Sequence, residues 1–341
     1  MSAILFGIVA AIVSWLLTQL AIAYARGARM QDAPAARRMH AQPTVRGAGI
    51  GFVAVIVAAW AGLGWSMGWE HPLGRWAQCA SLALLLVAVV SWIDDRHVLP
   101  ALPRLAAHFL AGGLLLIGVA PTLFELPLSA LAAAAALLAI ASTINFWNFV
   151  DGIDGLAASQ ALVLSAILAV FAVLAGDTPA AWFAAITAGA VLGFLPSNFP
   201  RARAFMGDVG SASLGCMVAA LALQPREAQW PALWPALLLA APVLLDAGLT
   251  LAWRMLRRRR RWWYTAHREH LYQWLARSGW GHTRTTLVWL ACTAGIAVVV
   301  LLIGPERPQT MLTAVIVVYL VGALGWRLAR DRTLAGARRR A

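Results

Sequence analysis

The chain has 341 residues, of which 61% are hydrophobic and 12% are charged. A soluble domain usually carries about a quarter charged residues, so these proportions exclude an ordinary water-soluble protein and indicate one that lies largely within a membrane. The formal net charge of +13 comes from 27 basic residues, all of them Arg, against 14 acidic residues. In a soluble protein such a charge would suggest nucleic-acid binding.

Apolar runs predict an all-α, polytopic membrane protein. A bilayer core of about 30 Å needs roughly 20 apolar residues per helix, and on this basis we expect about eleven transmembrane helices in one domain, residues 1–341. The first run lacks a preceding basic segment and a small-residue cleavage site, so we interpret it as a membrane span and not as a signal peptide. The runs lie near residues 3–24, 49–67, 76–93, 105–119, 124–145, 157–174, 179–196, 209–223, 232–253, 285–303 and 310–328.

The distribution of Arg predicts the orientation. If the N-terminus is periplasmic and the C-terminus cytoplasmic, the cytoplasmic segments hold 24 of the 27 Arg residues, and only Arg75, Arg226 and Arg307 lie outside. This asymmetry follows the positive-inside rule, so the net charge favours contact with anionic inner-leaflet lipid over nucleic-acid binding. The predicted cytoplasmic loops that could carry a site are residues 25–48, 94–104, 146–156, 197–208 and 254–284.

Acidic residues collect on the same predicted side. An acid at the membrane edge costs free energy unless it has a partner, so grouped acids there suggest a function. Three loops contain them: Asp94 with Asp95, Asp151 with Asp154, and Asp208. Mg²⁺ usually binds one or two carboxylates together with substrate phosphate oxygens, so these loops predict a site for a phosphorylated substrate. On its own, the Asp pair could instead end a helix and pair with Arg96, and each of the other two loops could be a turn with a helix cap.

Five segments carry motifs in a fixed order. The first loop reads DAPAARRMHAQPTVRGAG from Asp32 to Gly49, and it is followed by the Asp pair, NFVDGIDGLA from Asn148, FMGDVGS from Phe205, and Asp246 before the basic loop. Together they resemble the polyprenyl-phosphate N-acetylhexosamine-1-phosphate transferases, the family that also contains the muramoyl-pentapeptide phosphotransferase of peptidoglycan synthesis. The first loop departs from the family pattern at Val45 and Ala48.

The last large loop bears on the branch of this family. Here the chain reads HREHLYQ from His267 to Gln273, where the peptidoglycan enzyme has a His-rich triplet. The form in this chain looks more like the O-antigen and surface-polysaccharide branch. The muramoyl-pentapeptide enzyme is one alternative, and a transporter or flippase of anionic lipids is another from a different class. A transporter should carry polar groups near the bilayer midplane, whereas the acids here collect on one side.

The resemblance implies a reaction and its cofactor. It implies transfer of N-acetylhexosamine-1-phosphate from UDP-GlcNAc, UDP-FucNAc or UDP-QuiNAc to undecaprenyl phosphate in the bacterial inner membrane, with release of UMP. It implies Mg²⁺, or alternatively Mn²⁺, with Asp208 as the first-choice ligand. Asp94 and Asp95 would orient or deprotonate the lipid phosphate or help to hold the metal. Because a phosphate monoester is already largely dianionic at neutral pH, we expect Asp95 to position its substrate.

The resemblance also implies substrate-binding residues. An Asn amide can contact ribose or phosphate, two His residues three apart can share a helix face, and Arg makes bidentate phosphate contacts. The two Asp residues of the 146–156 loop could alternatively be structural caps. The implied partners are the UDP-sugar, polyprenyl phosphate and membrane lipids, without nucleic acid, and a homodimer is left open. The residues concerned are Asn145, Asn148, Asp151, Asp154, His267, Arg268, His270 and Arg46, with Arg38 and His40 as first-loop matches of unassigned role.

Two further features have open interpretations. The run Arg257 to Arg261, followed by two Trp residues, would anchor the loop to anionic headgroups, with direct substrate binding as the alternative. Asp246 lies inside the ninth apolar run, where it could pair with an Arg or line the site.

Overall fold

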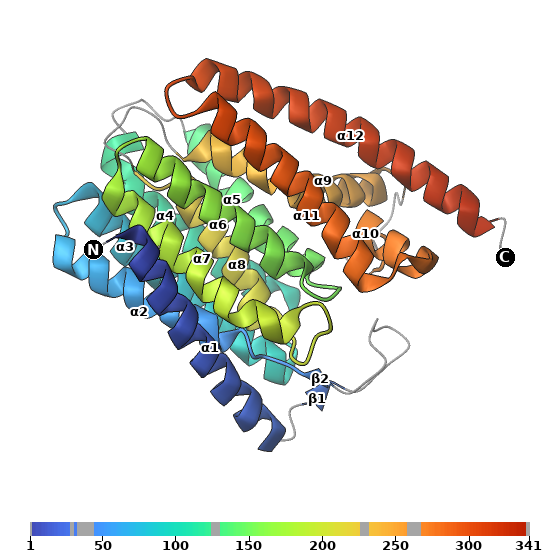
Figure 1. The fold of residues 1–341 in the computed structure, drawn as a ribbon, viewed down its shortest axis with the longest axis horizontal. Helices are drawn as coiled ribbons and strands as arrows, with labels where there is room; N and C mark the ends of the chain where they lie inside the picture. Colours follow the sequence, from blue (N-terminus) through green and yellow to red (C-terminus); the bar gives the residue numbers. More distant parts are fainter. Residues whose placement is uncertain are drawn as a thin grey trace.

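The computed structural model describes residues 2–27, 31–32, 44–123, 130–225, 232–257 and 267–338. These residues form a bundle of long helices that run roughly side by side, with α11 and α12 along one edge and α1 along another (Figure 1). The helices are α1 (Ala3–Gly27), α2 (Ile50–Met67), α3 (Pro72–His97), α4 (Ala101–Leu123), α5 (Ala130–Val150), α6 (Leu156–Leu174), α7 (Thr178–Asn198), α8 (Gly207–Ala222), α9 (Leu233–Arg257), α10 (Leu271–Leu275), α11 (Gly281–Ile303) and α12 (Pro308–Arg338).

The predicted all-helical, polytopic membrane fold is confirmed. In the described part of the chain, ten helices are long and apolar enough to cross a membrane. The remaining predicted run, the eighth in chain order at residues 209–223, forms α8, which has only 16 residues. Every residue of α8 except Asp208 and Ala222 is buried, and the helix packs against α3 and α5. A helix surrounded by protein need not match the thickness of the bilayer, which accounts for its short length.

Several helices extend beyond the apolar runs into polar sequence. Helix α3 continues to His97, so Asp94 and Asp95 lie in its last turn and not in a loop. Helix α5 ends at Val150 and therefore includes Asn145 and Asn148, while the predicted start of its run at residues 124–129 lies outside the described residues. Hydropathy scores polar side chains as solvent-exposed and so places these ends too early, whereas here Asp94, Asp95 and Asn145 have protein partners.

Two small elements were not predicted. Residues Gln31–Asp32 (β1) pair antiparallel with Thr44–Val45 (β2), and the five-residue α10 followed by a π-helical segment, Ala276–Trp280, divides the long loop before α11. Neither has a periodic pattern long enough to be read from the sequence.

Small residues and aromatic side chains hold the bundle together. Helices α1 and α7 can approach closely because Gly189 has no Cβ; a Cβ there would collide with the carbonyl oxygen of Gly7. Membrane helices widely use such small residues where they pack together. Between α2, α3 and α7, the buried rings of Trp60, Trp76 and Phe183 pack together. The Nε1 of Trp60 donates to the Phe183 carbonyl at 3.2 Å, so this polar atom is satisfied within the apolar core.

The predicted cytoplasmic loops meet at one end of the bundle, as far as the structure describes them. The residues before α2 bond to those before α8, with Ala48 N donating to Phe205 O at 3.1 Å. The α5–α6 loop contacts α11 through Thr286, whose hydroxyl donates to the Asp154 carbonyl at 2.8 Å. Tyr272 of α10 donates its hydroxyl to Phe149 O at 2.8 Å. Segments far apart in sequence therefore form one composite surface, which we call the site end.

Candidate active site

The carboxylate of Asp95 joins α3 to the beginning of α8. Its two oxygens accept hydrogen bonds from the backbone N–H groups of Asp208 at 3.0 Å and Val209 at 3.1 Å. These are donors that a helix cannot satisfy internally, and the negative charge also suits the positive end of the helix. A Cβ on Gly207, which has φ +72°, would lie 2.6 Å from Asp95 Oδ2, so the turn before α8 needs glycine.

Arg46 from the first loop bridges two of the predicted catalytic carboxylates. Its Nη2 lies 2.9 Å from Asp95 Oδ1 and 3.0 Å from Asp208 Oδ1. Burial opposes the charge of Arg46, but Asp95 and Asp208, with a smaller effect from Asp151, raise its pKa overall. Arg46 therefore stays charged and offsets the repulsion between the two carboxylates.

A second arginine holds Asp94. Arg104 Nη1, at the beginning of α4, lies 2.9 Å from Asp94 Oδ2 and 3.9 Å from Asp208 Oδ2. The other oxygen of Asp94 accepts from the backbone N–H of Leu99. Asp94 is thus enclosed by the α3–α4 turn, and its side chain is only 6% exposed. The sequence motifs did not mark Arg104, because it stands apart from the Asp pair and has no pattern around it.

Asp208 is the most accessible of these three carboxylates. Its side chain is 21% exposed, against 4% for Asp95 and 6% for Asp94. Among the described residues, no group of three or more His, Cys, Asp or Glu side chains is arranged to hold a metal ion. The partly exposed oxygens of Asp208 are of the type that Mg²⁺ binds when it takes one or two carboxylates and completes its coordination with substrate phosphate and water, and a metal role for Asp208 stays a prediction.

Asp151 adds another carboxyl group beside this cluster. Burial of the α5–α6 loop raises the pKa of Asp151 well above its ordinary value, and the charge of Asp208 raises it further. Arg46 opposes this shift, while Asp95 and Asp154 add to it. The charged form of Asp151 is therefore disfavoured beside Asp208, and a divalent cation at this place would relieve that repulsion.

Asp154 connects three parts of the site end. Its Oδ2 accepts from the backbone N–H of Ala202 at 3.2 Å, and its Oδ1 lies 3.0 Å from His282 Nδ1 of α11. Asn198 supports the same loop by accepting from Gly155 N at 3.1 Å and donating to Ala204 O at 3.0 Å. These contacts fit the structural alternative for Asp154, which sequence reasoning had left open. His282 and Asn198 were missed because each acts through one contact with a distant segment.

Asn145 and Asn148 occupy the last two turns of α5. The amide of Asn145 lies 3.0 Å from His108 Nδ1 of α4 and donates to Ala141 O at 2.8 Å. Both side chains of this pair are at least partly buried, so α4 fixes the position of Asn145. Asn148 is partly exposed one turn closer to Asp151. A substrate-binding role for either residue stays a prediction.

The loop with the two predicted His residues is fixed by Asp246. This buried carboxylate of α9 accepts from the backbone N–H groups of Leu271 at 2.8 Å and Tyr272 at 3.2 Å, and therefore caps α10. Asp246 also accepts from Trp326 Nε1 of α12 at 3.0 Å. Together with the Thr250 hydroxyl at 3.5 Å, these partners give Asp246 a structural role, whereas lining the site, the other alternative from the sequence, stays a prediction.

His267 and His270 lie next to each other before α10, with ring centroids 4.9 Å apart. His270 is 3% exposed and packs between the rings of Phe149 and Tyr272. Burial lowers the pKa of His270 to about 4, so it is neutral at physiological pH. His267 is partly exposed, and its Nδ1 accepts from Glu269 N at 3.3 Å. Of the two, His267 is the one that a substrate can reach.

Some predicted residues lie outside the described part of the chain. These are Arg38 and His40 in the first loop and Arg258 to Arg261 in the basic run. Arg268 is described and partly exposed, and its carbonyl accepts from Arg277.

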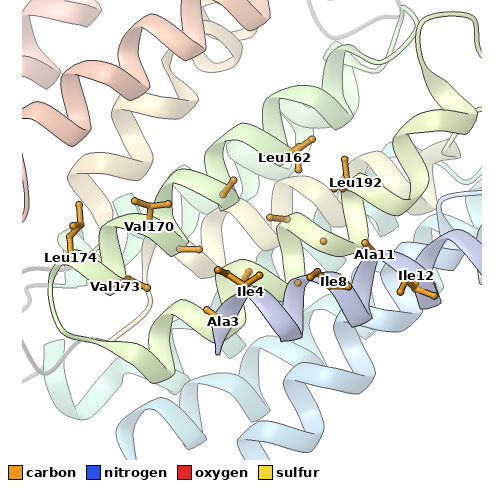
Figure 2. Close-up of a pocket in the computed structure, with 16 residues that line it drawn as sticks. Ala3, Ile4, Ile8, Ala11, Ile12, Leu162, Val170, Val173, Leu174 and Leu192 are labelled. Carbon is orange, nitrogen blue, oxygen red and sulfur yellow. The ribbon is translucent and has the colours of Figure 1, made fainter. Parts of the chain in front are cut away.

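An apolar cavity lies away from the site end. It has a volume of about 600 Å³ and is lined by residues of α1, α6 and α7. Ile4, Ile8, Leu162 and Val173 are among these residues (Figure 2). Its lining has no titratable side chain. The residues that α1 contributes to it come from the half of that helix nearer the N-terminus. It cannot supply acid, base or metal chemistry.

Comparisons with known proteins identify the family of this chain. Residues 77–225 match the model of glycosyl transferase family 4. The decaprenyl-phosphate N-acetylglucosaminephosphotransferase of Mycolicibacterium smegmatis is 32% identical over 94% of this chain and 87% of its own length. The protein of the same name from Mycobacterium leprae is 30% identical over 92% of this chain and 87% of its own length. This chain belongs to glycosyl transferase family 4, and it is a multi-pass membrane transferase.

A second group of relatives matches over less of the chain. The phospho-N-acetylmuramoyl-pentapeptide-transferase of Clostridioides difficile is 32% identical over 40% of this chain and 41% of its own length. The full-length matches therefore lie with the N-acetylglucosaminephosphotransferases.

The different environments of Asp95 and Asp208 predict different effects of removing each charge. Asp95→Asn should destabilise the protein by about 1–3 kcal/mol, because Asp95 satisfies two buried backbone donors and Arg46. Asp208→Asn should keep or raise the melting temperature, because it removes one of several like charges. Thermal unfolding of both variants in one detergent checks this, and a larger loss for Asp208→Asn would contradict the assignment.

The buried His270 predicts a pH dependence of stability. Its folded-state pKa of about 4 lies below the unfolded value of about 6.5, so its contribution is fully present above pH ~6.5 and is lost as the pH falls toward 4. Melting temperatures measured between pH 7 and 4.5 should fall less steeply in His270→Gln than in the parent protein. Equal slopes would show that His270 is protonated in the folded state.

Proposed function

We propose that this protein transfers N-acetylglucosamine-1-phosphate from UDP-GlcNAc to a polyprenyl phosphate, releasing UMP and starting assembly of a surface polysaccharide. The observation that carries the proposal is the cluster at the site end, where Arg46 joins Asp95 and Asp208 and Arg104 lies beside them. The names of the full-length relatives, which act on decaprenyl phosphate, support the acceptor class and the sugar. UDP-FucNAc and UDP-QuiNAc are the other donors that the sequence allows.

The reaction joins two anions, so charge neutralisation and positioning dominate the catalysis. Asp208 would hold Mg²⁺, which when bound supplies positive charge to the phosphate oxygens. The side chains of Arg46 and Arg104 are about a third exposed, so their guanidinium groups would contact the entering phosphates as well as the carboxylates. Asp94 and Asp95, whose oxygens already have partners, would keep these guanidinium groups and the beginning of α8 in place.

The nucleotide sugar would bind between the α5–α6 loop and the loop before α10. Asn148 and Asp151 on one side and His267 and Arg268 on the other are partly exposed at the site end. The bond between Tyr272 and Phe149 O holds the two sides at a fixed separation. A rigid frame with partly exposed polar side chains is what substrate positioning requires.

The peptidoglycan enzyme and a transporter are the competing functions. The partial matches to the muramoyl-pentapeptide transferases and the missing His triplet disfavour the first. For the second, the buried acid nearest the middle of a span, Asp246, has backbone and indole partners and so serves to hold α10.

The reaction is tested by UMP release from UDP-GlcNAc and undecaprenyl phosphate, with purified protein and either Mg²⁺ or EDTA. We expect Mg²⁺-dependent release that falls by about 10²–10³-fold in Asp208→Asn, the size of effect seen when one charge-stabilising group is removed. Glu306→Gln is the matched control, because Glu306 is an exposed acid between α11 and α12, and it should keep full activity.

The donors separate the candidate functions. Release from UDP-FucNAc or UDP-QuiNAc but not from UDP-GlcNAc would replace the sugar and keep the enzyme class. Release from UDP-MurNAc-pentapeptide alone would assign the protein to peptidoglycan synthesis. No release from any of these donors by folded protein would contradict the transferase proposal.

A further inference from the structure

Three arginines converge on one tryptophan where α9 and α12 meet, away from the carboxylate cluster. The guanidinium carbons of Arg330, Arg257 and Arg327 lie 4.4, 4.8 and 5.4 Å from the ring centroid of Trp253. Each contact is favourable by itself because the ring face attracts a cation. Three like charges around one ring nevertheless repel one another, which calls for an anion between them.

Arg330 is the member of this group that most needs a partner. It is only 4% exposed, and its guanidinium also lies over the ring of Trp326, 5.4 Å from the centroid. Its Nε and Nη1 are buried, and among the described residues neither has a hydrogen-bond partner. Leaving charged donors buried and unpaired is costly, so the arrangement points to a ligand that accepts hydrogen bonds and carries negative charge.

One acid close to this group balances one of its three charges, and a second is engaged elsewhere. Asp331 pairs with Arg327 at 3.1 Å, and Glu269 pairs with Arg254. The stretch 258–266, which follows α9 and lies outside the described residues, contains four more Arg residues and no acid in its sequence. Among the described residues, Arg257 and Arg330 are therefore the members of the group for which no ion pair with an acid is seen.

The surroundings of the group are those of a membrane surface. Leu324 and Leu328 of α12 are 61% and 49% exposed, and Leu256 of α9 is 80% exposed. These apolar side chains flank the arginines on helices that are long and apolar enough to span a bilayer. Acyl chains can cover such side chains while a headgroup phosphate meets the guanidinium groups, and Trp residues favour this depth.

We infer that Arg257, Arg327 and Arg330, with Trp253 and Trp326, form a binding site for the phosphate of an anionic membrane lipid. The planar fork of Arg330 suits two phosphate oxygens at once. This site is separate from the proposed reaction and does not depend on it. It lies beside a structural connection to the site end, because Trp326 donates to Asp246, which caps α10. A bound lipid should therefore stabilise the folded protein.

The test is the thermal stability of the purified full-length protein in neutral detergent with added phosphatidylglycerol, phosphatidylcholine or inorganic phosphate. We expect a rise in melting temperature with phosphatidylglycerol alone. Arg330→Gln should weaken the apparent affinity for phosphatidylglycerol by about tenfold, the loss expected for one charge-assisted hydrogen bond. Arg332→Gln is the matched control, since Arg332 is exposed on the same helix, and its response should equal that of the parent protein.

Several results would overturn the inference. An equal rise in melting temperature with phosphatidylcholine would mean that the site does not distinguish headgroups by charge. A full rise with inorganic phosphate would identify a site for free anions. An unchanged affinity in Arg330→Gln would exclude this residue. If that variant does not fold, Arg327→Gln provides the test, because the Arg327 side chain is 59% exposed and its loss should leave the fold intact. An unchanged lipid response in Arg327→Gln would then reject the site.

Discussion

The attachment of the Asp95 carboxylate to the beginning of α8 is the contact on which the arrangement of the site depends. It joins the last turn of one membrane helix to the first turn of another more than a hundred residues later, and Arg46 closes the connection from a third segment. Because α8 is buried on nearly all sides, its beginning cannot move without disturbing the core. Asp208, in the first turn of α8, is therefore held in place by a carboxylate that performs a different task.

The site brings several carboxyl groups close together, and their mutual repulsion opposes folding. Asp94 and Asp95 have their charges matched by arginines and backbone donors, while Asp208 and Asp151 are less completely compensated. In the proposed reaction, a bound cation would relieve this repulsion between the carboxylates. The proposed distinction between the carboxylates that hold the structure and Asp208, which would bind the ion, rests on what each oxygen contacts.

Much of this architecture is readable from sequence, because a bilayer imposes a length and a polarity that soluble proteins do not require. Each apolar run corresponds to a helix, and the motifs of widely separated loops come together as the Arg distribution suggests. Sequence could not show that Asp95 caps α8 or that Asp246 caps α10, since both depend on backbone groups brought near by tertiary packing. Arg104 and His282 could not be recognised from the sequence for the same reason, because each contacts a residue that is distant in sequence.

The most direct test of the central claim is Mn²⁺ binding measured by electron paramagnetic resonance, with UDP-GlcNAc present and Mn²⁺ standing in for Mg²⁺. The account predicts an immobilised Mn²⁺ signal in the parent protein and in Glu306→Gln, and its loss in Asp208→Asn although that variant remains folded. Unchanged Mn²⁺ binding in Asp208→Asn would contradict the account, because the most accessible carboxylate of the cluster would then have no part in holding the ion.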